Sequence, residues 1–505
     1  MSKRNVRSIP FFPFSLAVYP VLNLFASNVG YAMFRWTIPI GAITAGAAGA
    51  LLIGGYFLLR DWGRAAVFAG IGILFFFSYG AAFSIFDHIL TPIGIIGRNR
   101  YLMPLYFLSF FTGGWILLRK SRSWRNEILP LNAVSLILVM LPIMRIIGNR
   151  IQTSTVGDSL PEMSSVSPQP PHRDIYYVIL DGYARRDVLQ DCYEFDNSEF
   201  VDYLQNRGFH VLRHSQSNYA LTMLSLSSIL NMDYINESLE RINGEAAKTK
   251  FLANRIENNL VEHTLKRLGY TIVRMPSGFP FTHVSRYVDI NYGANIIPGD
   301  FIAMLARTTL ARPLIQNGFL LPHLSRAQFL EVFDRISTVP NRPGPTFTFA
   351  HIVSPHPPYQ FDANGNPASA SANQGDPWMN KTAYIEQMKF LNHKIENTLD
   401  SIFENSTIPP IIIIQGDHGP ICTPDSSLDS DKYMRYRFSN LSAFYLPGVT
   451  DFTRYDAMTS VNTFRVVFNA YFGANIHLLE DKSFFSHWQK PFDFQPLPPL
   501  PQASP

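Results

Sequence analysis

Long apolar runs fill the first 150 residues, and shorter apolar runs follow in the rest of the chain. The long runs lie at about 10–27, 38–59, 65–86, 101–118 and 128–147. Each is close to the roughly 20 residues that a helix needs to cross the hydrocarbon core of a bilayer. Any one of them could be a buried helix of a soluble protein, but five in succession with almost no acidic residues favour a membrane. We therefore expect a membrane domain of five transmembrane helices over residues 1–150.

From residue 174 to residue 488 the apolar runs are short and alternate with amphipathic stretches. The runs lie at 175–180, 271–275, 347–353, 411–415 and 443–446. Continuous runs of this kind, rich in β-branched residues, are typical of strands in a sheet that helices cover on both faces. The stretches near 195–206, 222–231, 256–268, 326–338, 380–404 and 460–472 predict those helices. The pattern predicts an α/β/α sandwich over residues 174–488.

Two segments outside these domains are rich in proline. Residues 151–173 combine prolines with serines and threonines and show no apolar period, which predicts a linker. The Pro-rich tail over residues 489–505 is expected to lie extended on the surface or to be disordered.

Composition and charge agree with two unlike parts. Charged residues make up only 16% of the chain, against about a quarter in soluble domains. Residues 1–150 hold 14 Lys and Arg but 3 Asp and Glu. Because these basic residues lie between apolar runs and form no basic face, a nucleic-acid partner is not expected. Two cysteines are too few for a disulfide-rich scaffold or a CxxC metal site.

The basic residues also predict the orientation, since short loops that carry them stay in the cytoplasm. Nine of them flank the spans on one side, and the opposite loops carry Arg35, Arg98 and Arg100. The nine are Lys3, Arg4, Arg7, Arg60, Arg64, Arg119, Lys120, Arg122 and Arg125. With five spans, everything after residue 150 is expected on the extracytoplasmic side, periplasmic or extracellular.

Three predicted strands end in residues that could bind a metal ion. Asp181 follows the run 175–180, Asp417 and His418 follow 411–415, and His356 follows 347–353. In sheets of this class, chemistry gathers beyond the carboxyl ends of the strands. Two carboxylates and an imidazole suit one divalent ion, Zn²⁺ or Mn²⁺. An Asp-Gly pair alone is more often an ordinary turn, so the prediction depends mainly on Asp417 and His418.

A nucleophile is expected at Thr222, where a predicted helix begins. The free N–H groups and the positive dipole end of a helix stabilise a nearby anion. Taken alone, a threonine there is more often a helix cap, but its place in the chain between the ligand groups favours the site. His351, within the run 347–353, is as readily a packed core histidine as a second substrate contact.

Four motifs together resemble the sulfatase-type branch of the alkaline phosphatase superfamily. They are LDGY at 180–183, LTMLSLSSIL at 221–230, SPHPPY at 354–359 and GDHG at 416–419. By architecture the chain is similar to membrane-anchored lipoteichoic acid synthases and phosphoethanolamine transferases, which place five spans before an outward-facing catalytic domain. The resemblance implies that Asp181, Thr222, Asp417 and His418 bind the catalytic metal. It also implies that Thr222 is the nucleophile and that His356 contacts the transferred group.

The sequence departs from the family pattern at three points, which concern the reaction, the number of metal ions and the substrate. The segment around Thr222 lacks the C/S-x-P-x-R motif from which sulfatases make formylglycine. No Asp is followed by His four residues later, which is the ligand pair that two-zinc phosphatases add, so a second metal is not expected. The lipoteichoic acid and phosphoethanolamine enzymes usually present Glu where Asp181 stands, which leaves the substrate open.

The expected function is therefore transfer of phosphoglycerol or phosphoethanolamine from a membrane phospholipid to an envelope glycan or lipid, through a phosphothreonine intermediate. One alternative is a hydrolase of phosphate or sulfate esters, which differs only in accepting water. The other is a non-catalytic membrane protein that retains the fold. Five spans favour the transferase because one span would tether a hydrolase, and the complete ligand set argues against the non-catalytic protein.

The two cysteines follow predicted ligands. Cys192 comes eleven residues after Asp181, and Cys422 comes four residues after His418. Unpaired thiols are disfavoured in an oxidising extracytoplasmic compartment, and both segments leave the same edge of the sheet. We expect a disulfide between them, with a pair of small buried hydrophobes as the alternative.

Overall fold

The computed structural model describes residues 9–28, 34–90, 99–119, 124–152, 160, 163, 166–167, 169–275, 277–293, 299–316, 322–369, 371–373, 376–422, 430–450 and 456–498. The chain divides into two compact units. Unit 1 is Met1–Thr155 with Gly299–Leu321, and unit 2 is Val156–Pro298 with Pro322–Pro505. Part of the predicted linker, the end of the tail, and six residues used for the orientation lie outside the described residues: Lys3, Arg4, Arg7, Arg98, Lys120 and Arg122.

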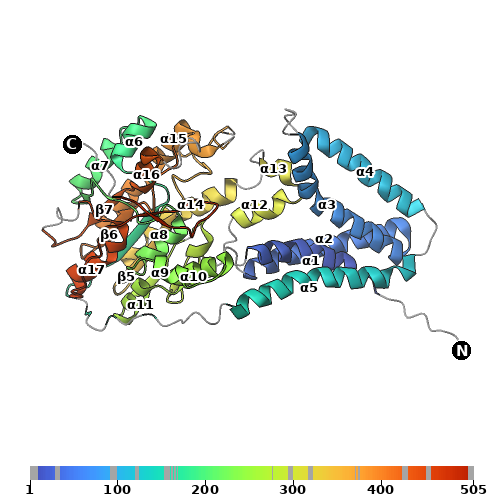
Figure 1. The fold of residues 1–505 in the computed structure, drawn as a ribbon, viewed down its shortest axis with the longest axis horizontal. Coiled ribbons are helices and arrows are strands. Elements are labelled where there is room, and N and C mark those ends of the chain that lie inside the picture. Colours follow the sequence, from blue (N-terminus) through green and yellow to red (C-terminus); the bar gives the residue numbers. More distant parts are fainter. Residues whose placement is uncertain are drawn as a thin grey trace. The chain divides into compact units, whose positions relative to one another are not determined.

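Five helices of unit 1 occupy the five long apolar runs (Figure 1). They are α1 (Phe12–Ser27), α2 (Phe34–Leu59), α3 (Trp62–Leu90), α4 (Asn99–Arg119) and α5 (Ile128–Gln152). In lipid every backbone polar group must be satisfied within the segment, which favours helices for apolar runs of this length. Within the described residues, Phe34–Leu59, Trp62–Phe86 and Ile128–Gly148 are long and apolar enough to span a membrane, and α1 is a shorter apolar helix. The count of five spans stays a prediction.

Unit 1 also contains α12 (Gly299–Arg307) and α13 (Arg312–Gln316), which come much later in the chain. The turn between them makes two backbone hydrogen bonds with α3: Gly80 N donates to Thr308 O and Leu310 N donates to Phe76 O, both at 3.0 Å. The segment falls within residues 174–488, which the apolar pattern assigns to the sandwich, because a short amphipathic stretch gives no membrane signal. The chain therefore passes between the two units at three places.

Unit 2 is built on a seven-stranded sheet of order β2-β7-β6-β1-β5-β3-β4. The strands are β1 (Ile175–Leu180), β2 (His210–Val211), β3 (Thr271–Arg274), β4 (Ile290–Asn291), β5 (Thr346–Ile352), β6 (Ile411–Gln415) and β7 (Ser442–Tyr445). Strands β6, β1, β5, β3 and β4 pair in parallel, whereas β7 pairs antiparallel with both of its neighbours, β6 and the edge strand β2. The five predicted runs are all strands, and the two-residue edge strands β2 and β4 were not predicted.

Side chains of the central strand β1 pack into the hydrophobic core on both faces of the sheet. Tyr176, Val178 and Leu180 pack into one hydrophobic cluster, whereas Ile175, Tyr177 and Ile179 pack into another. The first cluster holds α6 (Arg186–Tyr193), α7 (Ser198–Asn206), α14 (Pro322–Ile336) and α15 (Lys381–Asn405). The second holds α8 (Thr222–Ile229), α9 (Asn236–Glu240), α10 (Glu245–Glu257), α11 (Leu260–Arg267) and α17 (Thr463–Phe472). Helices on both faces of the sheet confirm the predicted fold class of a helical membrane domain followed by an α/β/α sandwich.

The strand order decides which strand ends meet. Strand β1 lies between β5 and β6, pairing Ile179 with His351 on one side and with Gln415 on the other. Because these three strands are parallel, the residues that follow them emerge at one edge of the sheet.

Candidate metal centre

Three chain segments reach the site from neighbouring strand ends. Asp181 follows β1, and its backbone N–H donates to Ile352 O on β5 at 3.0 Å. Asp417 and His418 follow β6 after Gly416, where a Cβ atom would lie 2.5 Å from Tyr183 O. Glycine is therefore required at 416, because any side chain would push the ligand loop away from β1.

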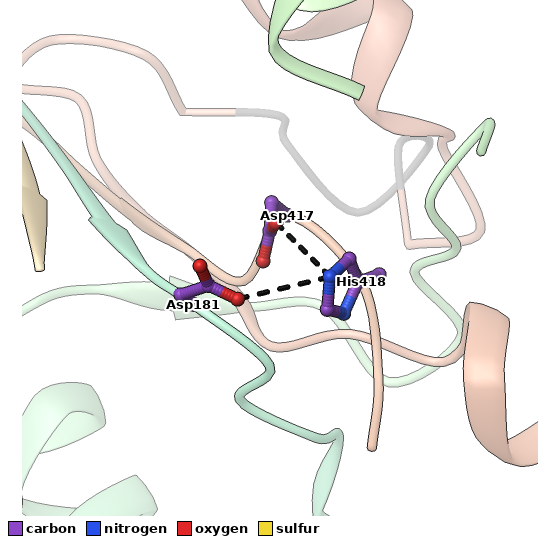
Figure 2. A group of neighbouring side chains, drawn as sticks. All are labelled: Asp181, Asp417 and His418. Atoms are coloured by element: carbon purple, nitrogen blue, oxygen red, sulfur yellow. Dashed lines mark ion pairs between the residues drawn. The ribbon is translucent and has the colours of Figure 1, made fainter. Parts of the chain in front are cut away.

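Asp181, Asp417 and His418 form a compact group (Figure 2), with one ligand-type atom from each within 4.8 Å of the others. Nε2 of His418 lies 3.3 Å from Asp417 Oδ2 and 3.7 Å from Asp181 Oδ1. All three side chains are buried, and these two carboxylate oxygens have no hydrogen-bond partner among the described residues. Buried polar atoms are nearly always partnered, so two such oxygens facing one imidazole nitrogen fit a divalent cation.

Thr222 is the first residue of α8, as predicted, and its Oγ1 lies 3.2 Å from His418 Nε2. Unlike the other three residues, Thr222 is only half-buried. The structure therefore brings together all four residues that were predicted as metal ligands, with the hydroxyl on the more accessible side. Metal binding by them stays a prediction.

The charges around the two carboxylates differ. Burial alone would raise the pKa of Asp181, but the surrounding histidines, above all His356, lower that pKa below its ordinary value. Burial, and then the charge of Asp181, raise the pKa of Asp417 to about 8. Without a metal ion, Asp181 is therefore ionised at neutral pH while Asp417 is mostly protonated.

The imidazole of His418 is neutral at physiological pH. Burial, and then the Arg437 guanidinium, hold its pKa well below the ordinary value. A neutral imidazole has a free lone pair, which is the form that binds a metal ion.

His356 lies beside the site and is half-buried. Its backbone N–H donates to Asp181 O at 3.0 Å, and its ring centroid is 6.4 Å from that of His418. The ring of Trp378 contacts it at 4.8 Å between centroids and covers Gly182, where a Cβ would lie 2.9 Å from the indole. His356 is thus placed within reach of a group bound at the site, with Trp378 as a wall next to it.

His351 lies behind Asp181 and is buried. Its Nε2 is 3.4 Å from Asp181 Oδ2, and its Nδ1 is 3.3 Å from the hydroxyl oxygens of Ser277 and Thr282. This position supports a role in orienting the Asp181 carboxylate, because partners of ligand residues commonly fix their orientation. Direct contact with a substrate stays a prediction for His351.

Two residues near the site were missed by the sequence analysis. Trp378 lies in a short 3-10 helix, Pro377–Met379, and Arg437 lies on α16 (Asp431–Phe438), a helix that was not predicted. Nη1 of Arg437 is 2.9 Å from Nδ1 of His418. Neither residue belongs to a motif or to a regular apolar pattern, so the sequence offered no signal for them.

The predicted disulfide is confirmed. Cys192 on α6 is bonded to Cys422, with their Cα atoms 6.3 Å apart. The bond ties the helix that follows Asp181 to the loop that follows His418.

Comparisons with known proteins find similarity in structure only. No family model matches the chain, and no curated protein sequence matches it. The zinc complex of the C-terminal periplasmic domain of EptC from Escherichia coli aligns with 65% of this chain and 94% of its own, at 12% identity and a TM-score of 0.44. The integral membrane lipooligosaccharide phosphoethanolamine transferase EptA from Neisseria meningitidis aligns with 94% of this chain and 96% of its own, at 11% identity and a TM-score of 0.41.

A sulfatase-class protein of Bacteroides fragilis aligns with 66% of this chain at 10% identity and a TM-score of 0.38. In structure the chain is thus similar to phosphoethanolamine transferases and to sulfatases. Since these TM-scores are below 0.5, the functional argument that follows depends on this chain's own residues.

Proposed function

We propose that this protein is a metal-dependent membrane enzyme that transfers phosphoglycerol or phosphoethanolamine from a phospholipid to an envelope glycan or lipid. One observation carries the proposal: the hydroxyl of Thr222 and two unpartnered carboxylate oxygens converge on Nε2 of His418. This arrangement is the one expected for a hydroxyl nucleophile that a divalent ion activates.

Asp181, Asp417 and His418 would hold a single Zn²⁺ or Mn²⁺ ion, because two carboxylates and a neutral imidazole suit these ions. Three protein ligands and one exchangeable position are typical of catalytic zinc sites, and the Thr222 hydroxyl, 3.2 Å from His418 Nε2, would supply the fourth group. Bound there, the ion would lower the pKa of the hydroxyl and offset charge on the phosphoryl oxygens.

In the first step, Thr222 Oγ1 attacks the phosphorus of the lipid headgroup. The bond from phosphorus to the diacylglycerol oxygen breaks, and that oxygen leaves with a proton equivalent to the one that Thr222 loses. In the second step, an acceptor hydroxyl attacks the phosphothreonine, loses its proton, and restores the Thr222 hydroxyl. His356, half-buried beside the ligand group, would contact the transferred phosphoryl group in both steps.

The lipid donor is supported by unit 1, whose helices expose large apolar side chains such as Phe57 and Leu58. Such surfaces are typical of contact with lipid. The extracytoplasmic orientation is supported by α12, which follows residue 150 in the chain and whose Phe301 contacts Trp36 at 6.0 Å between ring centroids. Trp36 adjoins Arg35 in the first turn of α2, the end of that helix that the charge pattern assigns to the outside.

The test is to trap the covalent intermediate on the full-length protein in detergent. Incubation with Zn²⁺ and phosphatidylethanolamine or phosphatidylglycerol should add the headgroup phosphate ester to the peptide that contains Thr222, detected by mass spectrometry. Thr222→Ala should abolish the adduct. If neither lipid gives an adduct nor loses its headgroup, the proposal fails. If the headgroup is released to water, and the rate of this release does not fall when an acceptor is added, the protein is a hydrolase instead.

A further inference from the structure

Arg437 is a buried arginine next to the metal centre, and only 5% of its surface is exposed. No described carboxylate forms an ion pair with it, whereas Arg435, two residues earlier on the same helix, pairs at the surface with Asp191. A buried charge without an ion-pair partner is costly, so it is retained where another interaction needs it.

The guanidinium bonds to both chain segments that form the site. Nη2 donates to Ala220 O, and Nη1 donates to Gly419 O, each at 2.5 Å. Ala220 comes two residues before Thr222, and Gly419 comes directly after His418. One side chain thus connects the segment that carries the nucleophile to the loop that carries two ligands.

The same guanidinium helps to fix the orientation of the His418 ring. Nδ1 of His418 lies 3.0 Å from Gly419 O and 2.9 Å from Nη1 of Arg437, while Nε2 faces the carboxylates. The guanidinium and the carbonyl that it holds therefore both border one edge of the ring, and fixing them also fixes the ring. A lysine could keep the charge, but it lacks the rigid fork that bonds two carbonyls at once.

We propose that Arg437 is a positioning residue: it clips the Thr222 segment to the His418 loop and so holds the hydroxyl against the ligand group. The proposal rests on the proposed function for its chemistry, but the geometry of the clip is independent of the substrate. Loss of the clip should misplace Thr222 while Asp181, Asp417 and His418 still converge. A substitution of Arg437 should then lower turnover strongly and change the metal affinity little.

The test compares Arg437→Lys with Arg435→Lys as a matched control on the same helix, both in the full-length protein in detergent. Zn²⁺ affinity is measured by competition with a chromophoric chelator. Turnover is measured on a soluble aryl phosphodiester, which needs no lipid or acceptor. We expect Arg437→Lys to bind Zn²⁺ within about tenfold of the parent, to keep KM within a few-fold, and to lose kcat on the order of 100-fold, since small misplacements of a reacting group cost that much. Arg435→Lys should leave all three unchanged.

Amide hydrogen exchange gives a readout that needs no turnover. In Arg437→Lys, exchange should rise at residues 220–224 and 418–420, with the thermal unfolding of unit 2 unchanged. If the parent protein turns over no phosphodiester, the proposed function fails. The exchange pattern alone then tests whether Arg437 holds the Thr222 segment against the His418 loop. An unchanged exchange pattern, a kcat within threefold of the parent, or a joint loss of Zn²⁺ affinity and thermal stability would each overturn the role of Arg437.

Discussion

The two units of this protein differ in which side chains they expose and which they bury. Unit 1 exposes large apolar residues along its helices, among them Ile43 at 72% and Leu58 at 71%. In the described part of unit 2, only Met379, Ile408, Leu478 and Trp488 are exposed among large apolar residues, whereas both candidate ligand carboxylates are buried. Lipid in place of water explains the first pattern, because apolar surface costs nothing there.

The second pattern needs a functional reason, because burying a charge is costly unless it is paired or bound to a metal. Unit 2 buries two carboxylates, an imidazole and a guanidinium within one site. Hydropathy along the chain therefore identifies the membrane unit, whereas charged and polar side chains that are buried without an ordinary partner identify the site. The difference between the units also predicts that substitutions in the site change activity far more than stability, and that those in unit 1 act through packing.

Replacement of Thr222 should separate activity from stability most sharply. Thr222→Ala removes the proposed attacking oxygen, so turnover of phospholipid should fall at least about 1000-fold. One lost hydrogen bond costs only about 1 kcal/mol, so the thermal transition of unit 2 should barely move. Thr222→Ser keeps a hydroxyl and should retain measurable turnover. Turnover of the alanine variant within tenfold of the parent would remove Thr222 as the nucleophile.

Metal ions should stabilise unit 2 and leave unit 1 unaffected. A ligand at 1,000 times its Kd adds about 4 kcal/mol to the stability of the state that binds it. Zn²⁺ should therefore raise the unfolding temperature of unit 2, and EDTA should reverse the shift. Asp417→Asn should reduce the response strongly. An equal Zn²⁺ response in the parent and in this variant would mean that the ion binds elsewhere.

The same site makes the metal-free protein sensitive to pH. The pKa of Asp417 is raised to about 8, well above its value in an unfolded chain. Its contribution to stability is therefore fully present below about pH 4 and is lost as pH rises toward 8. Metal-free unit 2 should lose stability over this range, whereas Asp417→Asn should show a flatter profile. Denaturant unfolding in EDTA at several pH values measures the difference, and a matching slope in both proteins would contradict the assignment.

The positions of the candidate ligands at the strand ends could be predicted because they follow from local sequence. A run of β-branched residues marks a buried strand, and the first one or two residues after it lie at the carboxyl edge of the sheet, as Asp181 and Asp417 do. Arg437 and Trp378 could not be found this way, because each reaches the site from a short helix without a clear pattern. Their positions depend on how α16 and the segment around Trp378 pack, which is a property of the whole fold.

The placement of α12 and α13 was missed for a related reason. Their sequence is too short and too mixed to indicate a membrane segment. Part of their contact with α3 is made by backbone atoms of Gly80 and Thr308, beside the packing of Leu310 against Tyr79 and Phe83. Backbone hydrogen bonds leave little trace in the pattern of side chains.

The disulfide should contribute moderate stability to unit 2 without supporting catalysis directly. Closing a loop of 230 residues with a disulfide contributes about 2–4 kcal/mol in typical cases. A double variant, Cys192→Ser with Cys422→Ser, should lower the free energy of unfolding of unit 2 by that amount and keep Zn²⁺ binding. Dithiothreitol should destabilise the parent but not this variant. A variant that loses Zn²⁺ would show instead that the bond holds the ligand loop in place.

The smallest effect is expected at Gly80, where unit 1 depends on a close backbone contact. A Cβ at this position would lie 2.5 Å from Arg307 O and from the Cα of Thr308. Overpacking of this kind costs about 1–3 kcal/mol, and the gain of roughly 1 kcal/mol from alanine in a helix offsets part of it. Gly80→Ala should therefore loosen α12 and α13 while leaving α3 helical, seen as faster amide exchange at Leu310. Gly113→Ala in α4, where a Cβ would meet nothing within 4 Å, is the matched control and should leave that exchange unchanged. Equal exchange at Leu310 in both variants would mean that α12 and α13 do not depend on the contact at Gly80, and that unit 1 holds this segment through side chains alone.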